Sequence, residues 1–264
     1  MALNLFQGYA EFGAKVAREA GEVTLRYYQK LPGVEYKADR SPVTVADRES
    51  ETLLRQRIEE KYPAHGILGE EFGVTRPDAD LRWLLDPIDG TQSFIRGVPL
   101  YGVMLALVAR SPESEKHDAP VVGVVHLPVL GETAVAWRGG GCWWNGAKAR
   151  VSDVTRLEDA VLLGTDPLAL NEKQAGYGRL RARVKLERGW GDCYGYVLVA
   201  TGRADIMMDP HLSEWDAAPL LPLIEEAGGR FTDWGGNRTI LGGDGFATNE
   251  KLHSDVVTLL SAAS

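Results

Sequence analysis

The sequence predicts a mixed α/β protein built from two lobes that meet near residue 150. The first half contains two helical patterns followed by many short apolar runs typical of strands. The second half alternates strands with helices, which indicates helices that cover the faces of a sheet. With 264 residues, of which 44% are hydrophobic, the chain can bury a large core as one domain or as two apposed lobes. We therefore expect an N-terminal lobe over residues 1–150 and a C-terminal lobe over residues 151–264.

Each element of the N-terminal lobe has its own signal. Residues 6–28 carry apolar side chains three and four positions apart, which predicts an amphipathic helix. A second helix is predicted to begin at Thr44 and to end before Pro63. Asn145-Gly146 marks a tight turn between two short extended stretches, and residues 111–120 are predicted to form an exposed loop. Strands are predicted at residues 66–69, 83–86, 102–110, 121–127 and 133–137, the last two as a hairpin.

The C-terminal lobe is predicted to alternate strands and helices up to its end. One helix, over residues 215–227, is expected to end at Gly228-Gly229. The other helices are predicted at residues 172–182, 194–201 and 251–261, and the strands at 161–165, 205–208, 230–232 and 245–248.

Composition excludes several classes of function. The formal net charge of -8 disfavours sequence-independent binding of nucleic acid, which needs a basic surface. The sequence has no run of about 20 apolar residues, and its N-terminus lacks a basic flank, so we expect a cytoplasmic protein that does not bind membranes. Cys142 and Cys193 stand far apart without ligand-spaced neighbours, which predicts small buried side chains rather than a zinc site or a disulfide.

The run Asp86–Thr91, with the sequence DPIDGT, follows an apolar strand pattern and concentrates oxygen ligands. The carboxylates of Asp86 and Asp89, the Ile88 carbonyl and the Thr91 hydroxyl suit Mg²⁺. Two such ions can clamp the attacking and leaving oxygens of a phosphoryl transfer. Gly90 allows close approach of the backbone to a ligand, and the residues after it, if helical, offer amide donors to an anion.

Three further acidic positions each have two interpretations. Glu70 follows a short strand and either projects into a cleft or, with Glu71, forms solvated surface. Asp47 lies three residues after Thr44, so it either closes a capping box or belongs to a shared carboxylate site. Asp216 opens a helix, so it either complements the helix dipole or belongs to that same site. Carboxylates gathered in one crevice would repel each other unless cations bound between them, so their joint pattern favours a metal site.

The order and spacing of four motifs strongly resemble those of the inositol monophosphatase superfamily of Mg²⁺-dependent, lithium-sensitive phosphatases. The resemblance runs from the segment Ser41–Asp47 to the C-terminal helix. It implies a layered αβαβα sandwich, a homodimer, and two to three Mg²⁺ ions per active site. The motifs are Gly69–Glu71, Asp86–Thr91, Trp215–Pro219 and Glu226–Gly229.

Two stretches, Ser93–Pro99 and Trp190–Tyr196, are most similar to the histidinol-phosphate phosphatase branch of this superfamily. Gln92-Ser93 departs from the residues usual after the threonine, at positions that are not ligands. We therefore expect a small phosphate monoester, histidinol phosphate, as the substrate.

The resemblance also implies a ligand set. Glu70, Asp86 and the Ile88 carbonyl would hold one Mg²⁺. Asp86, Asp89 and Asp216 would hold the second, so that Asp86 bridges the two ions.

The implied catalytic residues are Asp47, Thr91 and Glu70. Thr91 and Asp47 would orient and activate the attacking water, with a third, weaker ion near Glu70. Attack would be in line, without a phosphoenzyme. The implied substrate contacts, which include amides of Gly90 and Thr91 on the phosphate, are Asp86, Ile88, Asp89, Gly90, Thr91, Arg188, Asp192, Asp209 and Asp216.

Asp192 and Asp209 would lie beside the organic half of the substrate. Histidinol phosphate carries an ammonium group and an imidazole, and carboxylates form strong charge-assisted hydrogen bonds with such groups. The alternatives are a helix cap before Cys193 and a turn at Asp209-Pro210. Arg188 is expected to contact the phosphate or a neighbouring subunit.

Two other functions stay open at this point. The first is a phosphatase for inositol 1-phosphate or another small sugar or nucleotide monoester. The second is a regulatory interaction protein with residual phosphatase activity. The complete set of acidic ligands argues against the second, because clustered carboxylates are costly without a metal.

Overall fold

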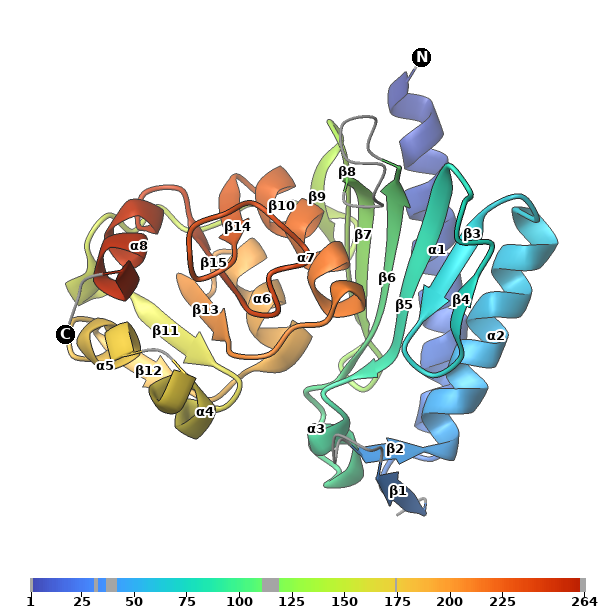
Figure 1. Ribbon diagram of the computed structural model, residues 1–264, viewed down its shortest axis with the longest axis horizontal. Coiled ribbons are helices and arrows are strands. Elements are labelled where there is room, and N and C mark those ends of the chain that lie inside the picture. Colours follow the sequence, from blue (N-terminus) through green and yellow to red (C-terminus); the bar gives the residue numbers. More distant parts are fainter. Residues whose placement is uncertain (1, 31–32, 37–41, 111–118, 174, 262–264) are drawn as a thin grey trace.

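The computed structural model, which describes residues 2–30, 33–36, 42–110, 119–173 and 175–261, stacks helices and sheets in five layers (Figure 1). Two helices cover the outer face of a large sheet, two lie between the sheets, and three cover the outer face of a smaller sheet. This confirms the αβαβα sandwich. In that order the helices are α1 (Ala2–Leu25) and α2 (Val45–Lys61), α6 (Asp192–Ala200) and α7 (Glu214–Glu226), and α4 (Pro167–Lys173), α5 (Ala175–Arg181) and α8 (His253–Ser261).

The large sheet has the strand order β10-β9-β8-β7-β6-β5-β3-β4, in which β3 runs parallel to β5 and the other neighbours are antiparallel. Its central strands are buried on both faces, as their continuous apolar sequences require. The strands are β3 (Gly66–Gly69), β4 (Gly73–Thr75), β5 (Leu81–Asp89), β6 (Gly102–Ala109), β7 (Ala119–Leu127), β8 (Glu132–Trp137), β9 (Gly141–Trp144) and β10 (Ala147–Ala149).

The small sheet has the order β12-β11-β13-β15-β14. Its strands are β11 (Val161–Gly164), β12 (Leu186–Arg188), β13 (Ile206–Asp209), β14 (Gly229–Thr232) and β15 (Gly245–Asn249). A separate ribbon pairs β1 (Val34–Tyr36) with β2 (Pro42–Thr44), and the short helices α3 (Thr91–Ile95) and η1 (Leu157–Asp159) complete the fold.

Strand β5 is longer than the predicted 83–86 and includes most of the acidic motif. Its pairing with β6 shifts register between Asp86 and Asp89, so that Asp89 lies opposite Gly102. Pro87 stands inside this irregularity and has no amide hydrogen to donate to the ladder. The irregularity therefore lets the strand deliver two acidic side chains to one place.

Several predicted boundaries were wrong. The first helix ends at Leu25 rather than at residue 28, and a turn follows it. The predicted helix 172–182 is two helices, α4 and α5. Helix α4 begins earlier than predicted, at Pro167, where Asp166 accepts hydrogen bonds from two amides of the first turn. Of the predicted loop 111–120, residues 111–118 lie outside the described residues, and Ala119 and Pro120 belong to β7.

Helix α7 lies directly against the large sheet. A Cβ atom added to Gly123 of β7 would overlap the carbonyl oxygen of Pro219 and would lie only 2.8 Å from Cγ of Pro222. Only a glycine in β7 allows the helix backbone to approach this closely. Both cysteines are buried and free, as predicted. In the described part of the chain, no helix is long and apolar enough to cross a membrane.

Candidate active site

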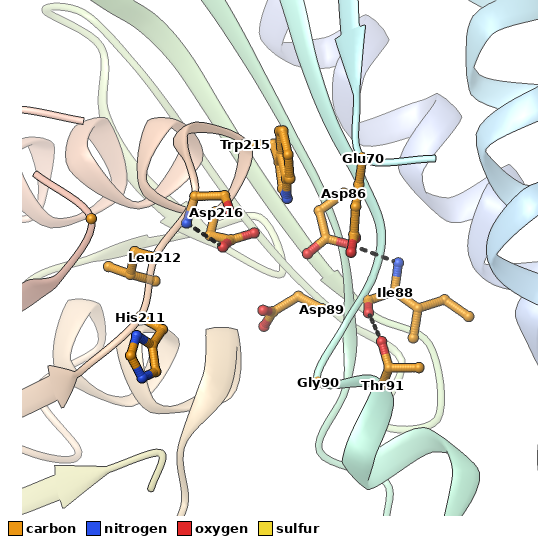
Figure 2. Close-up of a pocket in the computed structure, with 12 residues that line it drawn as sticks. Glu70, Asp86, Ile88, Asp89, Gly90, Thr91, His211, Leu212, Trp215 and Asp216 are labelled. Carbon is orange, nitrogen blue, oxygen red and sulfur yellow. Dashed lines mark hydrogen bonds between the residues drawn. The ribbon is translucent and has the colours of Figure 1, made fainter. Parts of the chain in front are cut away.

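The end of β5, the β3–β4 turn and the start of α7 enclose a cavity of about 580 Å³ (Figure 2). Seven residues predicted from the sequence line it together: Glu70, Asp86, Ile88, Asp89, Gly90, Thr91 and Asp216. His211 also lines this cavity. Trp215, from the motif Trp215–Pro219, lines the cavity as well, and the lining residues that the sequence did not indicate are Leu212, Ser213 and Gly243.

Three carboxylates converge in this cavity. Asp86, Asp89 and Asp216 each offer one oxygen, and these oxygens lie within 4.8 Å of one another. Burial raises the pKa of Asp86 well above its ordinary value, and the charges of Glu70, Asp89 and Asp216 raise it further. Burial and the Asp89 charge act on Asp216 in the same direction. The negative charges of the cluster are therefore not compensated by the described part of the protein, and the cluster favours a cation at its centre.

Glu70 approaches this cluster from the β3–β4 turn. Its backbone amide donates to the Leu85 carbonyl of β5 at 3.2 Å, one residue before Asp86. Figure 2 shows the Glu70 and Asp86 side chains next to each other at the cavity wall. A fourth acidic group therefore borders the space between the three clustered carboxylates.

The turn after Asp89 is held by short-range hydrogen bonds. Gly90 has a left-handed backbone with a φ of 79° and caps the N-terminus of α3. The Ile88 amide donates to Oδ1 of Asp86 at 2.9 Å, and the Thr91 hydroxyl donates to the Ile88 carbonyl at 3.0 Å. These bonds fix the Ile88 carbonyl and the Thr91 hydroxyl at the edge of the cavity.

For Asp47 and Asp216, the structure shows that the capping interpretation holds. Asp47 Oδ2 accepts hydrogen bonds from the amide and the hydroxyl of Thr44, at 2.8 and 2.6 Å. Asp216 Oδ2 accepts one from the Ser213 amide at 2.8 Å. Asp216 also belongs to the cluster, so capping and cavity roles coexist in one side chain. Burial raises the pKa of Asp47 to about 7, and Glu71 and Glu70 add to the effect.

Asp192 and Asp209 are neighbours of Asp89 on the side of the small sheet. Asp209 is buried and accepts a hydrogen bond from the Thr165 hydroxyl at 2.8 Å. Asp192 has a positive φ of 52° and lines a second cavity of about 390 Å³. A Cβ atom on Gly90 would lie 2.9 Å from Oδ2 of Asp192, so this carboxylate reaches the turn at the first cavity.

The charged forms of both carboxyl groups are destabilised by burial and by neighbouring negative charges. Burial raises the pKa of Asp192 well above its ordinary value, and Asp89 and Asp209 raise it further. Burial raises the pKa of Asp209 to about 7, with Asp89 contributing in the same direction. The charged forms would be favoured by a cationic group bound between them.

Cys193 contributes to the site in a way that the sequence did not reveal. Its backbone amide donates to Oδ2 of Asp89 at 2.5 Å, across 104 residues of sequence. This bond joins the start of α6 to the end of β5. Arg188, by contrast, is exposed on β12 and donates to the Glu187 carbonyl at 2.7 Å, so its predicted contact with substrate stays a prediction.

The donor set fits a divalent metal ion. Carboxylate and carbonyl oxygens are the ligands that Mg²⁺ prefers, and the spacing of the three clustered oxygens allows them to share an ion. The Ile88 carbonyl and Glu70 border the same cavity and complete an all-oxygen environment.

The five-layer fold and this acidic cavity beside a glycine turn define the class of protein, a phosphatase whose site can hold metal. Comparison with known proteins agrees. The pattern described as "Inositol monophosphatase family" matches residues 7–263. A histidinol-phosphatase of Chlorobaculum parvum is 41% identical over 241 residues, which are 90% of each chain. An inositol-1-monophosphatase of Mesorhizobium japonicum is 34% identical over 256 residues, 94% of this chain and 91% of the relative.

A solved structure, the extragenic suppressor protein suhB of Bartonella henselae, has the same fold. It superposes with a TM-score of 0.88 at 28% identity and covers 97% of this chain and 100% of its own. The chain belongs to the inositol monophosphatase family.

Proposed function

We propose that this protein is a Mg²⁺-dependent phosphatase that hydrolyses L-histidinol phosphate to L-histidinol, a reaction of histidine biosynthesis. The observation that carries the phosphatase activity is the convergence of Asp86, Asp89 and Asp216 within 4.8 Å, beside the turn at Gly90. The support for the substrate is the pair of buried carboxylates, Asp192 and Asp209, together with the similarity to a histidinol-phosphatase.

When bound, Mg²⁺ would lower the pKa of a coordinated water and neutralise charge on the phosphoryl oxygens. Glu70, Asp86 and the Ile88 carbonyl are the proposed ligands of one ion, and Asp86, Asp89 and Asp216 those of the second. Asp86 is thus shared by both ion sites.

The other residues of the turn bind and orient the reactants. Amides of Gly90 and Thr91 would receive the phosphate oxygens at the start of α3, where backbone donors favour an anion. The Thr91 hydroxyl, which donates to the Ile88 carbonyl, would accept a hydrogen bond from the attacking water and orient it. The carboxylate of Asp47 would accept the proton of this water.

Asp192 and Asp209 would bind the organic half of the substrate. The ammonium group of histidinol phosphate is cationic, and a cation near these two carboxylates relieves the repulsion that raises their pKa values. Inositol is neutral and cannot do so. The arrangement therefore favours an amino alcohol phosphate over a polyol phosphate.

The test compares kcat/KM for histidinol phosphate, inositol 1-phosphate, fructose 1,6-bisphosphate and a 3′-phosphonucleotide in saturating Mg²⁺. We expect histidinol phosphate to exceed each of the others by at least about 100-fold, or roughly 2.7 kcal/mol of differential transition-state stabilisation. A higher value for inositol 1-phosphate would contradict the proposed substrate. Only trace release of phosphate from all four would favour a regulatory binding protein.

The proposal also includes a homodimer in the cytoplasm that is inhibited by lithium. The homodimer is checked by light scattering coupled to size-exclusion chromatography, where a mass near twice 28.8 kDa is expected. A monomeric mass would contradict that part of the proposal.

A further inference from the structure

One buried ion pair outside the cavity contacts the turn that carries Glu70. Glu51 lies on α2 and is completely buried, and its Oε1 accepts a hydrogen bond from Nε of Arg55 at 2.7 Å. A charged side chain is rarely buried in this way unless it is paired and hydrogen-bonded. Its further partners explain the burial.

The carboxylate of Glu51 receives two backbone amides of the β3–β4 turn. The Glu71 amide donates to Oε2 at 2.7 Å, and the Phe72 amide donates to Oε1 at 3.2 Å. These are the first two backbone amides after Glu70. Each oxygen of Glu51 therefore holds one of the two peptide groups that follow Glu70 and that set the direction of its side chain.

Arg55 extends the same contact to the far side of the turn. Its Nη1 donates to the Thr75 hydroxyl at 3.1 Å, and its Nη2 donates to the Gly73 carbonyl. Glu51 and Arg55 together thus hold the turn at residues 71, 72, 73 and 75 from a single helix.

Gly69 shows how closely Glu51 approaches the strand before the turn. A Cβ atom at residue 69 would overlap the Glu51 carboxylate. The opposite side of the segment is fixed by the bond from the Glu70 amide to the Leu85 carbonyl. Glu70 therefore stands between two fixed points, α2 on one side and β5, which carries Asp86, on the other.

We propose that Glu51, oriented by Arg55, is a positioning residue that holds Glu70 at the metal site. Glu51 does not line the cavity and acts only through the turn. The inference rests on the proposed metal-dependent function, and it predicts that loss of the Glu51 carboxylate weakens metal binding rather than the binding of substrate.

The experiment uses Glu51→Gln, which keeps the size of the side chain. A glutamine has one acceptor oxygen, and its NH₂ group would face one of the two turn amides. Titration calorimetry with Mn²⁺ as the probe is expected to show at least a tenfold higher Kd, with KM for histidinol phosphate changed less than twofold at saturating metal. Arg57→Ala is the control, since Arg57 lies on the same helix and pairs with Glu19 and Glu60 instead.

A double-mutant cycle distinguishes positioning from general destabilisation. If Glu51 acts through Glu70, the Glu51→Gln change alters the Mn²⁺ Kd less than twofold in a Glu70→Gln background. Arg55→Gln, which leaves the two amide bonds of Glu51 in place, is expected to raise the Kd about threefold, also only when Glu70 is present. If Glu51→Gln does not fold, Arg55→Gln alone tests whether Glu51 and Arg55 position Glu70.

A Kd within twofold of the wild type in Glu51→Gln, or an equal rise in both backgrounds, would overturn the proposal. If only Arg55→Gln can be measured, an unchanged Kd for Mn²⁺ would also overturn the proposal. The wild-type isotherm tests the metal site itself, and the phosphate-release assay tests the substrate, so the proposed function and the positioning role can fail separately.

Discussion

At the scale of single residues, the acidic side chains of the site have structural as well as chemical roles. Asp216 closes the capping box of α7 with one oxygen and still belongs to the cluster with Asp86 and Asp89. Asp47 closes the capping box of α2, and burial, together with the charges of Glu71 and Glu70, raises its pKa. Each helix terminus is thus fixed by a side chain for which we also propose a role in the site.

Replacing Asp86 by asparagine should abolish turnover, because Asp86 is the shared ligand of both proposed ion sites. We expect kcat to fall at least about 1,000-fold, equivalent to about 4 kcal/mol of transition-state stabilisation, even in saturating Mg²⁺. The same change removes a repelled buried charge, so the metal-free variant should unfold at a higher temperature than the metal-free wild type. Near-native kcat in a phosphate-release assay would refute the assignment.

Asp192→Asn should alter substrate preference without disturbing the turn, because asparagine tolerates the positive φ of this position. Loss of a charge-assisted hydrogen bond is worth about 2 kcal/mol, so kcat/KM for histidinol phosphate should fall about 30-fold. The value for inositol 1-phosphate should change less than threefold. Asp166→Asn, in the same second cavity, is the control. Equal losses on both substrates would remove Asp192 from the specificity argument.

At the scale of elements, the N-terminus of α2 couples helix stability to the protonation of Asp47. The Thr44 hydroxyl accepts a hydrogen bond from the Ala46 amide at 3.1 Å and donates one to Asp47 at 2.6 Å. That second bond lowers the pKa of Asp47, against the larger raising effect of burial. One threonine therefore serves both the helix and the carboxylate.

Thr44→Val should cost about 1 kcal/mol of folding stability through the lost cap. It should also raise the pKa of Asp47 further above about 7, so the acidic limb of the pH profile of kcat should move to higher pH. Thr52→Val is the matched control, because the Thr52 hydroxyl donates to the Arg48 carbonyl within the same helix and has no other hydrogen bond among the described residues. An acidic limb that stays in place would show that Asp47 does not control it.

Elements with long periodic patterns were predictable, whereas several of the shortest elements were not. The N-cap of α2 was found because Thr44 and Asp47 form a local signal, and the β7–β8 hairpin was found from two apolar runs. Helix α3, with five residues, was considered but not predicted, and β1, β2 and β12 were missed, because three to five residues repeat the helical or strand period too few times to be recognised.

The same limit applied to the site. The cluster of Asp86, Asp89 and Asp216 was predicted because these residues belong to motifs whose order and spacing resemble a family. Glu51 and the Cys193 amide were missed, since their partners are distant in sequence or are backbone amides, which a side-chain pattern does not reveal.

At the scale of the whole molecule, burial of carboxylates makes folding depend on pH and metal. Carboxyl groups of Asp47 and Asp209 have pKa values of about 7, and those of Asp86, Asp192 and Asp216 are also raised. A carboxyl whose pKa is higher in the folded state binds more protons when folded, so stability falls as pH rises from the unfolded value near 4 through the folded value.

The unfolding temperature of the metal-free protein should therefore be lower at pH 8 than at pH 6.5. Histidines with lowered pKa, His65, His126 and His253, oppose this trend only below about pH 6.5, which sets the lower end of the comparison. Mg²⁺ should raise the unfolding temperature more at pH 8, where the carboxylates are charged. A metal-free unfolding temperature that rises from pH 6.5 to 8 would contradict this interpretation.

The glycine beneath α7 has a consequence for the choice of cation. Gly123 lets the backbone of α7 pack directly against β7 at Pro219, and this contact sets how closely α7, and with it Asp216, approaches the sheet that carries β5. Mg²⁺ needs oxygens at about 2.0–2.1 Å, whereas Ca²⁺ takes them at about 2.3–2.6 Å. A methyl group at residue 123 would lift the helix and enlarge the gap between the ligands. The preference for Mg²⁺ over the larger Ca²⁺ would therefore depend on Gly123, a residue of the sheet that does not contact the ion.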